Sequence, residues 1–161
     1  MVIKRAIERY IRLVLQDANL LETSRVLPVY TVYTQKKRES TVGALGKVNR
    51  RMIRLADQYS RSFVGDDSSE FPILIYGFFL CGPILAVLTM TIDDDQKKIN
   101  TGKLLSQFDL GERGQDVWNS LAIAITAMYI RSTLINVKEA AVVKGVWRFP
   151  DHVKSDVDED L

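Results

Sequence analysis

Three parts of the chain repeat apolar residues with the 3.6-residue period of an α-helix. In the first part the apolar positions are Ile3, Ile7, Tyr10, Ile11 and Val14. The same period extends over residues 41–59 and 115–137. We therefore predict a basic amphipathic helix at the amino terminus and two main helices at about 41–59 and 115–137.

The pattern in residues 115–137 also predicts which side of that helix faces the core. The apolar residues on one side are Val117, Leu121, Ala124, Ile125, Met128 and Ile135. Trp118 and Tyr129 follow the same helical spacing, and aromatic residues at such spacing usually serve a core. We expect Trp118 and Tyr129 to be packing residues.

Other segments have the composition or alternation of β-strands. Residues 26–34 are mostly β-branched and aromatic, and Pro28 places them at a sheet edge or at the beginning of a strand. Residues 84–92 alternate between two faces, and residues 142–149 form a last short strand. These elements predict an α+β fold in which a small antiparallel sheet packs with the two main helices.

The remaining segments complete this predicted organisation. Residues 97–115 contain Asn100-Thr101-Gly102 and Gly111, which predicts turns around a short helix. Residues 151–161 are acidic, and we expect them to be disordered. Residues 1–150 are then a single domain.

The apolar run at residues 71–92 carries no charge and leaves two interpretations open. About 20 such residues can cross a bilayer as a helix, and the basic and acidic flanks agree with that orientation. However, Gly77 and the pair Gly82–Pro83 interrupt the run, and a Gly-Pro pair more often marks a turn. We prefer a buried helix or strand, a turn and then a core strand; the alternative is a single membrane span.

Positive charge is concentrated in the first third of the chain. Residues 1–54 hold 12 Lys or Arg against 4 Asp or Glu, which leaves +8, whereas residues 55–161 hold 10 against 16, which leaves −6. Such asymmetry indicates polyanionic partners and head-to-tail association, so we expect a homo-oligomer.

Basic side chains gather at two places, each of which could otherwise be a solvated helix face. The first is a predicted polyanion-binding site in a strand-turn-helix unit, formed by Lys36, Lys37, Arg38, Lys47, Arg50, Arg51 and Arg54. The second is a predicted membrane-surface site on the amino-terminal helix, formed by Lys4, Arg5, Arg9 and Arg12.

The sequence offers no catalytic constellation. Its one histidine, His152, stands beside the acidic tail, and its one cysteine, Cys81, lies in the apolar run, where we expect it to be inert. The spacing needed for a P-loop or a calcium loop is absent. We therefore predict a protein that is not an enzyme, that needs no metal or cofactor, and that lives in a reducing compartment.

The segment LTMTIDDDQ, Leu88 to Gln96, resembles a strand and acidic turn in the matrix proteins of rhabdoviruses. The upstream order is also similar, with a threonine-rich strand at 29–34, a basic turn at 36–38 and a helix at about 41–59. The resemblance covers about a third of the chain. This sequence lacks the Pro-Pro-x-Tyr and Pro-Thr/Ser-Ala-Pro budding motifs of such proteins, and a helix-like segment replaces their long basic arm.

The resemblance implies a small oligomeric protein that coats the inner membrane surface and condenses ribonucleoprotein, within a virion if the source is viral. The two basic sites would take the membrane and nucleocapsid roles. Two alternatives stay open: a nucleic-acid-binding accessory protein without membrane affinity, and a single-span membrane protein through residues 71–92.

Overall fold

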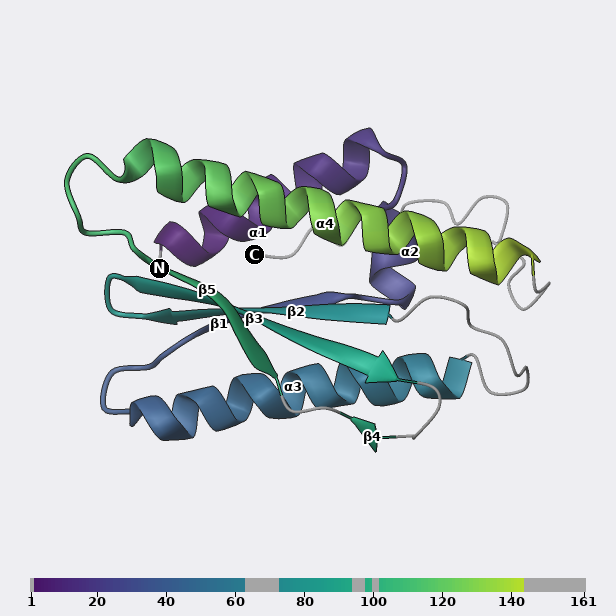
Figure 1. The fold of residues 1–161 in the computed structure, drawn as a ribbon, viewed down its shortest axis with the longest axis horizontal. Helices are drawn as coiled ribbons and strands as arrows, with labels where there is room; N and C mark the ends of the chain where they lie inside the picture. Colours follow the sequence, from purple (N-terminus) through teal and green to yellow (C-terminus); the bar gives the residue numbers. More distant parts are fainter. Residues whose placement is uncertain (1, 63–72, 94–97, 100–101, 144–161) are drawn as a thin grey trace, which may run out of the picture.

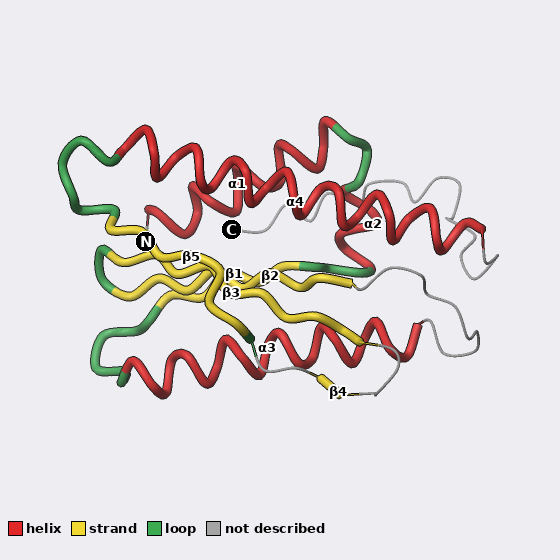
Figure 2. Tube along the Cα trace, in the orientation of Figure 1, coloured by secondary structure: helices red, strands yellow, loops and turns green. Residues whose placement is uncertain are grey.

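The computed structural model describes residues 2–62, 73–93, 98–99 and 102–143, and it has three layers (Figures 1 and 2). A central sheet separates one long helix, α3, from a layer of three helices, α1, α2 and α4. The helices are α1 (Val2–Asp17), α2 (Leu21–Val26), α3 (Thr41–Ser62) and α4 (Asp116–Val143). The strands are β1 (Tyr30–Thr34), β2 (Ile73–Cys81), β3 (Ile84–Asp93), β4 (Lys98–Ile99) and β5 (Lys103–Asp109). The predicted α+β class is confirmed.

The sheet is mixed rather than wholly antiparallel. Its order is β1-β2-β3, and both β4 and β5 pair with β3. All pairs are antiparallel except β1 with β2, which are parallel and are connected through α3. A parallel pair needs such a crossover because a tight turn cannot return the chain to the same end of the sheet.

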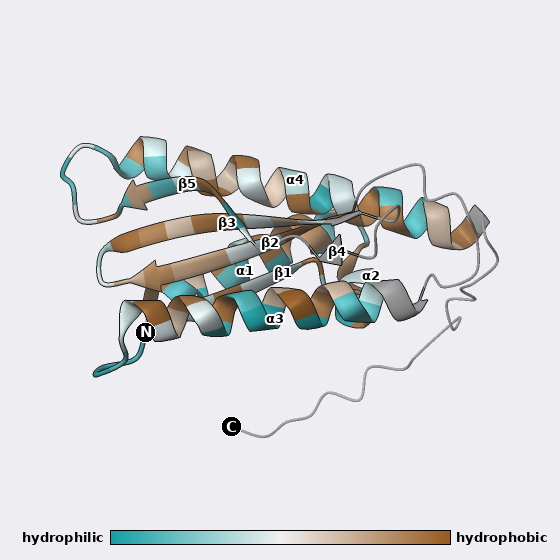
Figure 3. Ribbon diagram, turned by 60° about the horizontal axis from the view of Figure 1, so that its bottom comes forward, coloured by the Kyte–Doolittle hydropathy of each residue, from teal (hydrophilic) through white to brown (hydrophobic). Residues whose placement is uncertain are grey.

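Residues 73–92 of the apolar run belong to the β2–β3 hairpin, so the interpretation of residues 71–92 as a spanning helix is wrong. The hairpin turns at the predicted Gly82–Pro83 pair, and Gly82 has a φ of 57°, which glycine adopts without strain. In β2, Tyr76, Phe78 and Leu80 join the core under α1 and α4, and alternate residues join the core under α3. Because helices cover both faces of this hairpin, β2 and β3 are apolar along most of their length (Figure 3).

Several predicted boundaries are wrong. The first strand begins at Tyr30 instead of residue 26, because Leu21–Val26 forms helix α2. Within the described part of 97–115, the structure has strands β4 and β5 instead of a short helix. Residues 142–143 belong to α4, and the rest of the predicted strand at 142–149 lies outside the described residues, as does the acidic tail.

Helix α4 buries a different side from the predicted one. Its buried apolar residues are Ala127, Ile130, Leu134, Val137 and Ala141. The expected packing residues Trp118 and Tyr129 are 66% and 58% exposed. Because α4 is apolar on both sides, the spacing of its apolar residues does not identify the buried one.

Candidate functional site

The two predicted basic sites lie on opposite faces of the sheet (Figure 1). We call the first the α3 basic surface; its residues are Lys36, Lys37, Arg38, Lys47, Arg50, Arg51 and Arg54. We call the second the α1 basic surface; its residues are Lys4, Arg5, Arg9 and Arg12. The sheet and its two apolar cores separate the two surfaces.

The α3 basic surface is organised by the turn between β1 and α3. Here the Glu39 carboxylate accepts hydrogen bonds from the backbone N–H of Lys36 (2.9 Å) and from the hydroxyl of Tyr33 (2.9 Å). It also forms an ion pair with the Lys47 ammonium at 2.6 Å. Arg38 adopts a φ of 74°, so the chain reverses sharply between Lys36 and Glu39. These contacts therefore fix the conformation of the turn, in which three consecutive basic residues are exposed to solvent.

These contacts shift the pKa values of Glu39 and Lys47. The hydrogen bond from the Lys36 backbone, followed by those from Lys47 and Tyr33, lowers the pKa of Glu39 to about 2. The same carboxylate raises the pKa of Lys47. Both groups therefore stay charged at neutral pH, and each largely compensates the other.

Two of the seven basic residues are thus held by partners, which the sequence did not predict. Lys47 pairs with Glu39, and the Arg51 guanidinium stands 4.9 Å from the centre of the Tyr33 ring. Within the described ranges, the remaining basic side chains form no ion pair. They are all exposed: Lys36, Lys37, Arg38, Arg50 and Arg54.

The helical period explains why the arginines of α3 share one face. Positions 47, 50, 51 and 54 fall within about 100° of arc, beside the arc that is buried against β2. Along the helix they extend over about 10 Å. The only acidic residue in α3 is Asp57, one turn beyond Arg54. The surface is thus a short row of cations continuous with the basic turn.

The α3 basic surface has no exposed aromatic ring among its described residues. Tyr33 is 6% exposed and Tyr59 is 1% exposed. Proteins that read single-stranded bases usually stack them on exposed aromatic side chains. The arrangement is suited instead to phosphate groups, which guanidinium and ammonium groups bind without reading base identity.

Cys81 does not have the wholly apolar surroundings that the sequence indicated. Its thiol donates a hydrogen bond to the Gln35 side-chain oxygen at 2.7 Å, and the Gln35 amide donates to the Glu39 carbonyl at 2.6 Å. The cysteine is half-buried and helps to tie the end of β2 to the basic turn. None of its described contacts is a histidine or another base that could activate the thiol.

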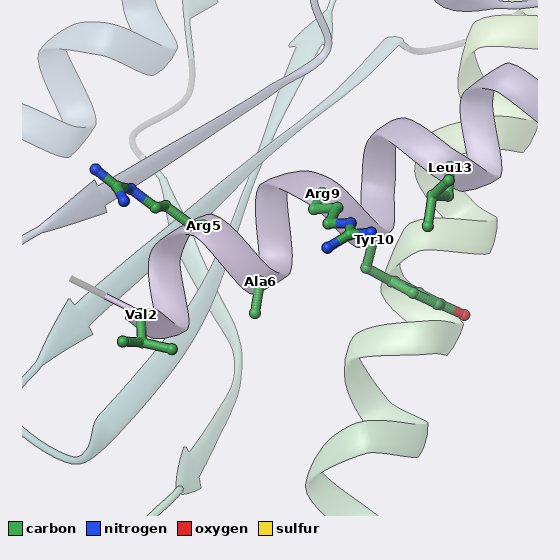
Figure 4. Close-up of a pocket in the computed structure, with 6 residues that line it drawn as sticks. All are labelled: Val2, Arg5, Ala6, Arg9, Tyr10 and Leu13. Carbon is green, nitrogen blue, oxygen red and sulfur yellow. The ribbon is translucent and has the colours of Figure 1, made fainter.

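The α1 basic surface combines cations with an apolar strip. Arg5, Arg9 and Arg12 are exposed, whereas Lys4 is half-buried and lies 3.5 Å from Glu8. Beside the arginines, a shallow hollow is lined by Val2, Arg5, Ala6, Arg9, Tyr10 and Leu13 (Figure 4). An exposed helix face that mixes arginines with apolar groups is typical of helices that lie at a lipid–water boundary.

Two further features of the described residues concern metal binding and membrane crossing. They contain no group of three or more His, Cys, Asp or Glu side chains that could hold a metal ion. One described helix, α4, is long and apolar enough to cross a membrane. That is weak support for a span, since the core helix of a soluble protein meets the same test.

No family model, curated protein or solved structure matches this chain.

Proposed function

We propose that this protein is a non-enzymatic, matrix-type structural protein that bridges an anionic membrane surface and a ribonucleoprotein. The observation that carries the proposal is the placement of two exposed basic helix faces on opposite sides of one sheet. A protein whose cations point in opposite directions can contact two polyanionic surfaces at once.

The α3 basic surface is the proposed ribonucleoprotein side. Five exposed cations that form no ion pair with the described residues give it the positive field that attracts a phosphate backbone. They are Lys36, Lys37, Arg38, Arg50 and Arg54. The lack of exposed aromatic rings among its described residues favours contact with phosphates over base reading. Affinity should therefore depend steeply on salt and little on sequence.

The α1 basic surface is the proposed membrane side. Three exposed arginines can approach anionic headgroups while Val2, Tyr10 and Leu13 contact the apolar boundary below them. The viral part of the proposal comes from the resemblance of Leu88–Gln96 to rhabdovirus matrix proteins. On this proposal the protein lies on the inner face of a membrane and in the virion, and it self-associates through its uneven charge.

The test is a flotation assay with anionic liposomes and fluorescently labelled RNA in the same tube. The wild-type protein should carry RNA to the liposome fraction. Arg5→Gln/Arg9→Gln/Arg12→Gln should lose flotation but keep RNA binding. Lys37→Gln/Arg50→Gln/Arg54→Gln should float without RNA, because the removed charges are those that face the phosphates.

A matched control removes two exposed cations outside both surfaces, Lys103→Gln/Arg113→Gln, and should bridge like the wild type. RNA binding of the wild type should weaken with salt, with a log–log slope on the order of −4 if about five phosphates are neutralised. Indifference of the wild-type protein to both lipid charge and RNA would falsify the proposal.

The same assay separates the runner-up function, a nucleic-acid-binding accessory protein without membrane affinity. The α3 basic surface alone is sufficient for that function. Salt-sensitive RNA binding without flotation of the wild-type protein would select it.

A further inference from the structure

The solvent-facing side of α4 is apolar over its first half. We call this side the α4 apolar stripe; its residues are Val117, Trp118, Leu121, Ile125, Met128 and Tyr129. Their exposed fractions run from 47% for Leu121 to 74% for Val117. No charged residue occurs between Asp116 and Arg131. The stripe is therefore an uncharged face about 20 Å long.

Core packing does not account for this stripe. The opposite side of α4 is already used, since Ala127, Ile130 and Leu134 are completely buried in the core shared with α1 and the sheet. Single exposed apolar residues are common, but a continuous apolar face of this size marks an interaction site. We therefore expect the α4 apolar stripe to contact a partner that is itself apolar.

The neighbouring helix indicates which occupant fits. Helices α1 and α4 pack against each other on the same face of the sheet. Tyr10 and Leu13 extend from α1 on the side of α4, and Arg9 lies beside Tyr10, whereas Arg5 extends from α1 away from α4 (Figure 4). The outer layer thus presents apolar and aromatic side chains next to arginines. An anionic lipid surface matches both components, because its headgroups neutralise arginine and its acyl boundary accepts apolar groups.

A second copy of the chain fits less well. In a two-fold symmetric dimer through this layer, the same patch of each copy would meet the other. The arginines of both α1 helices, Arg5, Arg9 and Arg12, would then enter one interface. Each α1 offers them only two carboxylates, Glu8, which already pairs with Lys4, and Asp17 at the end of the helix. Like charges brought together in an interface oppose association.

A membrane-spanning α4 also conflicts with the fold. Crossing a bilayer would withdraw Ile130, Leu134 and Val137 from the core over one face of the sheet. It would also expose Asn119 to lipid, although its side chain now donates to the Asp109 carbonyl at 2.9 Å. The same helix can reach lipid without this loss if it lies flat.

We infer that α4 lies parallel to an anionic membrane and inserts its apolar stripe at the boundary between headgroups and acyl chains, with Trp118 and Tyr129 as interfacial anchors. The inference rests on the membrane half of the proposed function, and it adds the residues and the orientation of the contact. The α1 arginines supply the electrostatic attraction, and the α4 apolar stripe supplies the insertion.

The first experiment uses the full chain and vesicles of mixed anionic and zwitterionic lipid. Leu121→Gln/Ile125→Gln should lower the vesicle partition coefficient at least tenfold, because two inserted aliphatic side chains become polar. RNA binding should change less than twofold, since α3 is on the other face. Glutamine and leucine have similar helix propensities, so circular dichroism and thermal unfolding should match those of the wild type.

The matched control places the same change on the opposite layer. Val42 and Leu45 of α3 are 83% and 42% exposed, so Val42→Gln/Leu45→Gln removes comparable apolar groups. This variant should partition into vesicles like the wild type.

The second experiment measures depth. The chain has two tryptophans, Trp118 and Trp147, so Trp147→Phe leaves Trp118 as the only reporter. Lipids brominated near the headgroup should quench Trp118 strongly. Ile125→Trp in a chain that also carries Trp118→Phe and Trp147→Phe should report the same shallow depth, whereas a spanning helix would carry position 125 about 10 Å deeper.

The outcomes separate the inference from the function on which it rests. If the wild type binds vesicles but Leu121→Gln/Ile125→Gln binds equally well, the stripe does not insert and only the inference fails. Deep quenching at position 125 overturns the inference as well. So does a stripe variant that turns a dimer into a monomer in sedimentation but still binds vesicles. If the wild type binds no vesicles, the membrane half of the proposed function fails together with it.

Discussion

At the residue scale, the carboxylate of Glu39 connects strand, turn and helix. It accepts hydrogen bonds from the Tyr33 hydroxyl and the Lys36 backbone, and it pairs with Lys47. These contacts stabilise the ionised form, which is why the pKa of Glu39 falls to about 2. A group with a lowered pKa contributes stability above its unfolded value, and that contribution disappears as the pH falls through the folded value.

The first prediction concerns the stability that the ionised Glu39 carboxylate contributes above its unfolded pKa. At pH 7, Glu39→Gln should unfold at a lower temperature than the wild type, because a neutral amide cannot replace the carboxylate. The difference should shrink as the pH falls from about 4.5 to about 2, where the wild-type carboxylate becomes protonated. Thermal unfolding of both proteins across this range measures it. If the unfolding temperatures of the two proteins differ by the same amount at every pH, the assigned role of Glu39 is contradicted.

The second prediction concerns a buried hydroxyl. The Tyr59 hydroxyl donates to the Leu27 carbonyl at 2.7 Å, and Tyr59 is 1% exposed. Tyr59→Phe should lower the free energy of unfolding by about 1–2 kcal/mol, because a buried carbonyl loses this donor. Tyr10→Phe is the matched control at a residue that is 40% exposed, and it should change stability by less than about 0.5 kcal/mol. Denaturant titration compares the two; equal effects would show that burial of the hydroxyl is irrelevant.

Residue-level detail was only partly predictable. The sequence placed the exposed cations of the turn and of α3 correctly, because charge and helical period are local properties. It did not predict that Glu39 neutralises Lys47 or that Arg51 lies over the Tyr33 ring, since these pairings depend on how the turn folds back on the helix.

At the element scale, α3 is held close to the sheet by a strand glycine. A β-carbon added to Gly77 of β2 would lie 2.6 Å from the Met52 sulfur and 3.2 Å from a Val48 methyl group. Both neighbours are completely buried. Glycine at this position therefore allows α3 to approach the strand closely.

The third prediction compares two substitutions by alanine. Gly77→Ala should destabilise the protein by about 1–3 kcal/mol, because the added methyl group would force the buried Met52 and Val48 side chains to shift. Gly46→Ala, within α3, meets no atom within 4 Å and should stabilise the protein by about 0.5–1 kcal/mol. Equilibrium unfolding gives both values. Effects of the same sign would contradict this account of the α3–β2 contact.

Prediction of whole elements succeeded where one side of an element differs from the other. Helices α1 and α3 have distinct polar faces, and their periods identified them. For α4 the element was predicted but its buried side was not, because both sides are apolar. Strand β5 was missed because its residues are exposed or half-buried on both faces, which removes the alternation that marks a strand.

At the scale of the whole molecule, the proposed bridge requires both basic surfaces in one particle but not in one chain. A monomer must carry both intact surfaces itself. An oligomer can combine an intact α1 surface from one copy with an intact α3 surface from another. The expected self-association, inferred from the split of +8 and −6 between the two parts of the chain, can therefore be tested with the bridging assay.

The fourth prediction is that mixing complementary variants restores bridging. Arg5→Gln/Arg9→Gln/Arg12→Gln should bind RNA without floating, and Lys37→Gln/Arg50→Gln/Arg54→Gln should float without RNA. Because subunits of an oligomer exchange or assemble together, an equal mixture should carry RNA to the anionic liposomes at a substantial fraction of the wild-type level. Each variant alone, at the doubled concentration, is the control. If the mixture behaves as the sum of its parts while the wild type bridges, a single chain makes both contacts, and self-association has no part in the bridge.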